Sequence, residues 1–161
     1  MKEAADINVR AAAYFVARTE ARCPHCGHAT SLVAVALPPT HEVRDPDSGV
    51  WQCAGGHAFL FHIAFLPDSV ARRLEVFSAR FQPLPGAMAT SGDWVNHCAH
   101  CEAPLEDQDI HCEPGVAFMP SSAAEAGGIE LWRIDAAFEA QMAGYALEPA
   151  FFTSMRMLRK R

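Results

Sequence analysis

The stretch ARCPHCGHATSLVAVAL, residues 21–37, joins a Cys-x-x-Cys pair to a run of β-branched and small apolar residues. Residues 9–22 include three consecutive bulky residues, Tyr14 to Val16, which favour extended backbone. A Pro-Pro pair beginning at Pro38 ends the run, because proline donates no backbone hydrogen bond and interrupts helices and central strands. The sequence therefore predicts a unit of strand, cysteine turn and strand.

A second Cys-x-x-Cys pair far along the chain completes a possible metal site. Each pair places two sulfurs on one side of a tight turn, and two facing turns supply the four thiolates of a tetrahedral zinc site. Gly27 follows the first pair and suits the positive φ that such turns commonly need, whereas Glu102 holds the equivalent place after the second. The predicted ligands of Zn²⁺ are Cys23, Cys26, Cys98 and Cys101.

Other ligand sets remain open. A local site with three cysteines and one histidine would use Cys23, Cys26, Cys53 and His57. A second metal would then take Cys98, Cys101 and either His111 or Cys112, with a further ligand from elsewhere. We favour the single four-cysteine site, because it needs no unidentified ligand.

Patterns between and beyond the pairs predict a mixed fold. The apolar run at residues 57–66 favours a buried strand, and a helix is expected from about residue 68 to residue 80. Further strands are expected at residues 108–112 and 129–134, and a helix at residues 136–146, where Phe138, Met142 and Tyr145 share helical spacing. The predicted fold class is α+β: a small antiparallel sheet with a zinc-ribbon-like module and one or two packed helices.

The predicted organisation is a single domain over residues 1–161. Its zinc module comprises residues 9–37 and 94–119, residues 40–93 form an inserted strand-helix segment, and residues 129–161 form a C-terminal strand-helix extension. A chain of 161 residues, half of them apolar, can bury a core without disulfides. A metal would therefore stabilise a local region rather than the whole fold.

The composition and the apolar pattern indicate the compartment of the protein and the kinds of partner that it binds. The net charge of -6 argues against nucleic-acid binding. Few basic residues lie near the cysteine pairs: Arg18 and Arg22 are close to the first, and none follows the second within ten positions. The sequence shows no secretory leader and no apolar stretch long enough to span a bilayer, so we expect no membrane association. We expect the protein to be cytoplasmic. In the cytoplasm thiols stay reduced and are available to bind a metal. A protein partner is possible, and the oligomeric state is left open.

The segments WVNHCAHCEAPLEDQDIHCEPGVAF (residues 94–118) and ARCPHCGHATSLVAVALPPTHE (residues 21–42) carry a resemblance to other proteins. They resemble a pattern found in small uncharacterised bacterial proteins with a split zinc ribbon formed by two Cys-x-x-Cys knuckles. The resemblance implies that both knuckles belong to one zinc-ribbon-like module. It implies no activity.

The functional hypothesis follows from the closed ligand set. Four protein thiolates leave no open coordination position, so the zinc is expected to be structural and to support a protein-interaction surface. The alternative is a zinc-dependent or thiol-redox enzyme with an open site involving Cys53, His57, His111 or Cys112. No HExxH motif or nucleophile elbow is present, so we favour a binding role over catalysis.

Overall fold

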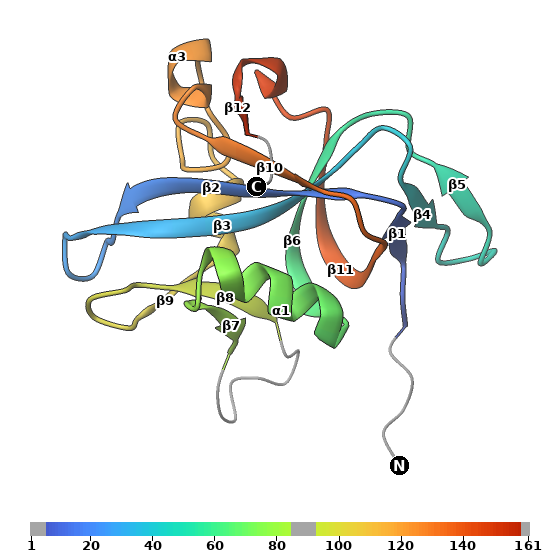
Figure 1. The fold of residues 1–161 in the computed structure, drawn as a ribbon, viewed down its shortest axis with the longest axis horizontal. Coiled ribbons are helices and arrows are strands. Elements are labelled where there is room, and N and C mark those ends of the chain that lie inside the picture. The colour runs from blue at the N-terminus through green and yellow to red at the C-terminus, as the bar shows by residue number, and fades with distance from the viewer. Residues whose placement is uncertain (1–5, 85–92, 159–161) are drawn as a thin grey trace.

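The computed structural model describes residues 6–84 and 93–158, and strands dominate them. Nine strands follow one another across the main path of the sheet (Figure 1). Their order is β12 (Arg156–Leu158), β10 (Glu130–Ile134), β2 (Tyr14–Arg22), β3 (Ala29–Leu37), β6 (Ala58–Phe65), β11 (Phe138–Leu147), β1 (Val9–Ala11), β4 (Glu42–Arg44) and β5 (Trp51–Cys53). Three short strands branch from β6: β7 (Phe81–Pro83), β8 (Trp94–His97) and β9 (Pro104–Leu105).

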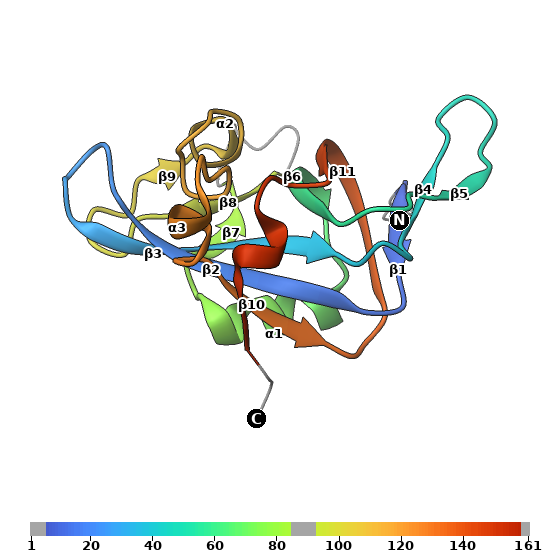
Figure 2. The ribbon, with the colours of Figure 1, turned by 90° about the horizontal axis from the view of Figure 1, so that it is seen from above.

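The sheet is antiparallel except where β12 runs parallel to β10. It twists so strongly that β11 and β6 run steeply across the long β2–β3 hairpin (Figures 1 and 2). The helical segments are short: α1 (Asp68–Phe77), α2 (Asp107–His111), α3 (Ala123–Ala126) and the 3₁₀ turn η2 (Phe152–Ser154). None of the helices in the described part of the chain has the length and apolar character needed to cross a bilayer.

Alternation along the central strands builds a core on each face of the sheet. In β3, Leu32, Ala34 and Ala36 belong to the core on the first face of the sheet, whereas Val33, Val35 and Leu37 belong to the core on the second face. Helix α1 covers the second face with Val70 and Leu74. Ile110, Phe118 and Phe152 cover the first. Because both faces are buried, the strand is apolar at nearly every position.

The predicted α+β class with a small sheet is wrong. Strands make up 44% of the described residues and helices 15%, and the two cysteine hairpins belong to one large curled sheet. The predicted strands near residues 29–37, 58–65 and 130–134 and the helix after Pro67 are present. Residues 85–92 of the predicted inserted segment, and residues 1–5 and 159–161 at the chain ends, lie outside the described residues.

Two elements have the opposite type to that expected. Residues 138–147 form strand β11 rather than a helix, because they pair with both β6 and β1. Residues 107–111 form helix α2 rather than a strand, and Asp107 and Asp109 lie in its first turn, where carboxylates favour a helix. The predicted inserted segment at residues 40–93 also contains the β4–β5 hairpin, which precedes its buried strand.

Tyr14 lies in the core on the second face of the sheet, and its hydroxyl group gives a prediction about stability. Its side chain is fully buried, its hydroxyl has no hydrogen-bond partner among the described residues, and burial raises its pKa. We expect Tyr14→Phe to leave the free energy of unfolding unchanged or to raise it by up to about 1 kcal/mol, because it removes an unpaired buried polar group. The matched variant Tyr145→Phe removes a hydroxyl bonded to His41 and should lower stability instead. Urea denaturation of both variants distinguishes them, and a large loss in Tyr14→Phe would contradict this account.

Candidate metal centre

The two Cys-x-x-Cys pairs lie at the tips of two hairpins that approach each other. Cys23 and Cys26 follow β2, and Cys98 and Cys101 follow β8. The Sγ atoms of Cys23 and Cys101 are 3.6 Å apart, as are those of Cys26 and Cys98. All four sulfurs lie within 4.8 Å of one another, and the four thiols are free. The structure thus brings together the four residues expected from sequence, in a cluster that could hold a metal ion.

The two turns share one backbone design. In the first, the Gly27 N–H donates to the carbonyl of Cys23 at 2.8 Å, and in the second the Glu102 N–H donates to the carbonyl of Cys98 at 3.0 Å. In each turn the amide two residues after the first cysteine donates to that cysteine's Sγ at 3.3 Å. Backbone N–H groups directed at sulfur stabilise the thiolate form.

Gly27 and Glu102 both adopt positive φ, 78° and 63°. A side chain in this conformation costs about 1 kcal/mol or more. A Cβ on Gly27 would meet no atom within 4 Å, so Gly27→Ala tests backbone strain alone. We expect Gly27→Ala to lower the free energy of unfolding by about 1 kcal/mol. Glu102→Gly should raise it by less, because it also removes an exposed ion pair with Arg80. Thermal denaturation measures both changes. Equal shifts of the same sign in Gly27→Ala and Glu102→Gly would contradict this prediction.

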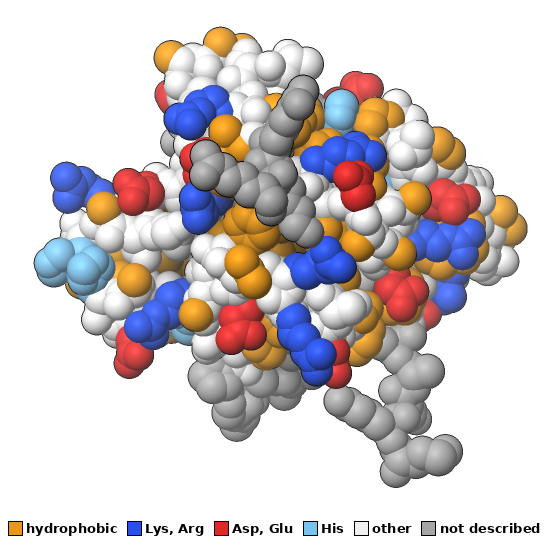
Figure 3. Space-filling model, viewed as in Figure 1, with side chains coloured by type: hydrophobic (Ala, Val, Ile, Leu, Met, Phe, Trp, Pro, Cys, Tyr) orange, Lys and Arg blue, Asp and Glu red, His pale blue; other side chains and the backbone are white. Residues whose placement is uncertain are grey.

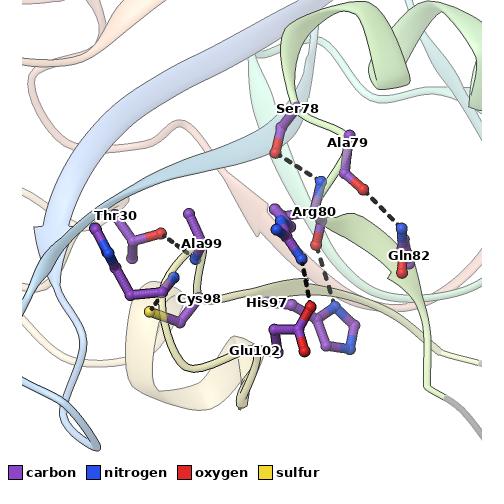
Figure 4. A network of polar contacts seen from close by, with 10 residues as sticks. Thr30, Ser78, Ala79, Arg80, Gln82, His97, Cys98, Ala99 and Glu102 are labelled. Carbon is purple, nitrogen blue, oxygen red and sulfur yellow. Dashed lines mark hydrogen bonds and ion pairs between the residues drawn. The ribbon is translucent and has the colours of Figure 1, made fainter.

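Polar contacts from neighbouring elements fix the second turn in place (Figure 4). The Ala99 N–H donates to Thr30 Oγ1 of β3 at 3.0 Å, which ties this turn directly to the first hairpin. Arg80 pairs with Glu102 at 3.0 Å, and its carbonyl accepts from His97 Nδ1 at 3.1 Å. These supporting residues could not be identified from the sequence, because nothing in their spacing marks them.

Two imidazoles add a further link between the hairpin tips. The rings of His28 and His100 are stacked, with centroids 4.6 Å apart and planes at 26°. Figure 3 shows histidine side chains gathered at the end of the molecule where the β2–β3 hairpin terminates. The sulfur cluster and this ring stack therefore join the same two turns.

The thiols differ in their acidity. The amides of Cys101 and His100 hold the pKa of Cys98 at about 6 despite burial. For Cys101, the Ala103 amide lowers the pKa, but burial and the three neighbouring sulfurs together raise it to about 11. Four thiolates this close repel one another, so full deprotonation requires a cation among them.

The sulfur spacing fits a thiolate-bound metal. A tetrahedral zinc site with Zn–S bonds of about 2.3 Å places its sulfurs about 3.8 Å apart. The observed cross-hairpin separations of 3.6 Å are close to this value and far longer than a disulfide bond of about 2.05 Å. Cys23 and Cys98 are 2% and 0% exposed, so one side of the cluster is shielded from water. The cluster therefore has the donor set and spacing of a closed metal site.

The alternative ligands do not join this cluster. Among the described residues, the four cysteines are the one group of three or more donors spaced to hold a metal. Cys53 and Cys112 are exposed, and His57 stacks on Phe152 with ring centroids 4.0 Å apart. His111 is 5% exposed and stacked between aromatic rings.

Helix α2 contains two further buried polar residues, His111 and Asp107. Burial lowers the pKa of His111 to about 3, and its Nδ1 has no hydrogen-bond partner among the described residues. Burial raises the pKa of Asp107 to about 6, although its Oδ2 accepts from the His62 N–H at 2.7 Å. His62 adopts a positive φ of 52° inside β6. The hydrogen bond to Asp107 therefore supports a strained backbone position in β6.

The raised pKa of Asp107 predicts a pH-dependent stability difference. A carboxyl whose pKa rises on folding contributes stability below its unfolded pKa of 3.8, and that contribution is lost as pH rises through about 6. Asp107→Asn keeps an oxygen acceptor for His62 without the charge. We expect this variant to exceed wild type by about 2 kcal/mol at pH 8 and by little at pH 4. Urea denaturation of both proteins at the two pH values checks this, and a pH-independent difference would contradict it.

No family model matches the chain, and neither the curated proteins nor the solved structures gave a match. The fold and the cysteine cluster therefore define only a class: a β-rich protein with four cysteines that could bind a metal ion.

Proposed function

We propose that the chain is a zinc-binding protein in which Cys23, Cys26, Cys98 and Cys101 hold one Zn²⁺ as thiolates. The observation that carries the proposal is the convergence of four free sulfurs within 4.8 Å from two hairpin tips. Zinc suits a four-thiolate tetrahedron and imposes no redox chemistry. Free thiols at such a site favour a reducing compartment, so the cytoplasm remains part of the proposal.

The role of the metal is structural. Four protein ligands would leave no position for water or substrate, so the ion would serve to join the β2–β3 tip to the β8–β9 tip. Other links between these tips are the packing of Leu32 and Leu105 in one core, the Thr30 contact, the Asn96 amide bonded to Val33, and the His28–His100 stack. The metal would thus hold a single-domain protein in a shape that presents a surface for protein binding.

Elemental analysis of the purified chain tests the proposal. We expect one zinc per chain in wild type, in Cys53→Ser and in Cys112→Ser, because the last two cysteines are exposed and lie outside the cluster. Iron in place of zinc would overturn the assignment of the ion, since four thiolates also suit iron. Two zinc ions per chain, or loss of zinc in Cys53→Ser, would show that the ligand set is different.

A further inference from the structure

A groove of about 650 Å³ lies beside the sulfur cluster, and each hairpin tip supplies one of its walls. Pro24 and His25 belong to the first cysteine turn, whereas Ala103 and Pro104 follow the second. The volume falls in the range of sites that bind small molecules or single peptide side chains. Because its walls are the two turns, the groove keeps this shape only while the turns stay together.

The floor of the groove is apolar. Leu32, Leu105 and Ile110 come from β3, β9 and α2, and all three belong to the core on the first face of the sheet. They are 1%, 5% and 7% exposed, so a ligand at this floor would complete packing already begun by the core. An apolar side chain is the group that gains most from such a floor.

The rim carries an unbalanced negative charge. Glu106 and Asp109 are exposed on the α2 side, and the ion pairs found among residues 6–84 and 93–158 include neither of them. Across the groove, Arg22 directs Nη1 to the carbonyl of Gly27 at 3.0 Å, which holds its guanidinium at the first turn. Its single positive charge offsets only one of the two carboxylates, so the rim keeps a net negative charge on the α2 side. A cation on a ligand would therefore be attracted to the α2 side.

We propose that this groove binds an extended segment of a partner protein that places an apolar side chain on the floor and an adjacent lysine or arginine beside Glu106 and Asp109. The apolar floor selects the apolar side chain, and the acidic rim selects the basic one. A segment with only one of these side chains would not fill the site. This inference rests on the proposed metal site, because the metal holds both walls. Zinc and the segment therefore strengthen each other's binding, as reciprocal linkage requires.

The test uses labelled peptides and the full chain loaded with zinc. The probe is an eight-residue fluorescein-labelled peptide with alternating leucine and lysine between glycine-serine ends. Its comparison peptides replace lysine by glutamate or leucine by serine. In fluorescence anisotropy we expect the leucine-lysine peptide to bind at least about tenfold more tightly than either comparison, the factor that corresponds to about 1.4 kcal/mol.

Charge variants locate the binding. Glu106→Gln combined with Asp109→Asn keeps the size of both side chains and should reduce affinity for the leucine-lysine peptide about tenfold. Glu20→Gln combined with Glu75→Gln removes two other exposed carboxylates, both outside the groove. This control variant should bind the leucine-lysine peptide with unchanged affinity. Equal binding of the three peptides, or unchanged affinity in the groove variant, would overturn the proposal.

Zinc content is measured in the same samples, so the two proposals can fail separately. One zinc per chain without peptide discrimination overturns the groove proposal and leaves the metal site intact. Peptide discrimination by a chain that contains no zinc overturns the metal site and its coupling to the groove. The expected result is discrimination that falls when zinc is removed by a chelator and returns when zinc is added.

Discussion

Cys98→Ser should abolish stoichiometric zinc binding and lower the free energy of unfolding by about 4 kcal/mol. Cys98 is fully buried in the core on the first face of the sheet, and its Sγ lies 3.6 Å from that of Cys26. Serine offers a poor ligand for zinc, so three thiolates would remain, and the binding free energy of a structural zinc is also folding free energy. Zinc content after gel filtration and thermal unfolding measure the two effects.

The metal contribution must be separated from packing in this variant. Wild type treated with a chelator loses the ion but keeps the Cys98 side chain, so the drop in stability on chelation gives the metal's share. Cys53→Ser and Cys112→Ser are the controls, since both cysteines are exposed. Full zinc content in Cys98→Ser would show that these four cysteines are not the ligand set.

Gly144→Ala should lower the free energy of unfolding by about 3 kcal/mol. Gly144 of β11 lies opposite Phe61 of β6, and a Cβ at this position would approach the Phe61 ring to 2.1 Å. Its φ is not in the positive range, so alanine is excluded by this contact and not by backbone strain. Phe61 in turn stacks on His111 with centroids 5.0 Å apart, so displacement of its ring would disturb that buried packing too.

A double-mutant cycle isolates the Phe61 contact. Phe61→Leu alone should cost less than Gly144→Ala, and the two together should be less destabilising than the sum of the single changes, because the smaller side chain makes room for the new methyl group. Ala143→Ser, at the exposed neighbouring position, is a control for substitutions in β11. Additive effects in urea denaturation would mean that Phe61 does not limit position 144.

The grouping of the four cysteines could be anticipated, because ligand chemistry demands it. Two Cys-x-x-Cys turns are each half of a closed site, and sulfur donors need one another whatever the rest of the fold does. The positive φ of Gly27 follows from the same turn geometry. Glu102 is a less typical residue than glycine after a Cys-x-x-Cys pair, yet it adopts a similar backbone conformation and pairs with Arg80.

The size of the sheet could not be anticipated from local patterns. Residues 138–147 contain Phe138, Met142 and Tyr145 at helical spacing, but a register shift between Gln141 and Met142 breaks the alternation that would have indicated a strand. Pairing with β6 and β1, which are distant in sequence, decides the conformation. Gly144 was the available indication against a helix, since glycine is unfavourable in a helix interior.

The separation of the two cysteine pairs along the chain has a consequence for biosynthesis. The sulfur contacts join residues 72 and 78 positions apart. A ribosome that has released only the first half of the chain has exposed two of the four thiols, which is half of a ligand set. Tight capture of a metal ion at the proposed site would therefore wait until the β8–β9 tip has emerged and docked. Metal supply would then act on maturation only after the second pair has emerged, and nascent chains would be most vulnerable to thiol oxidation in the interval between the two pairs.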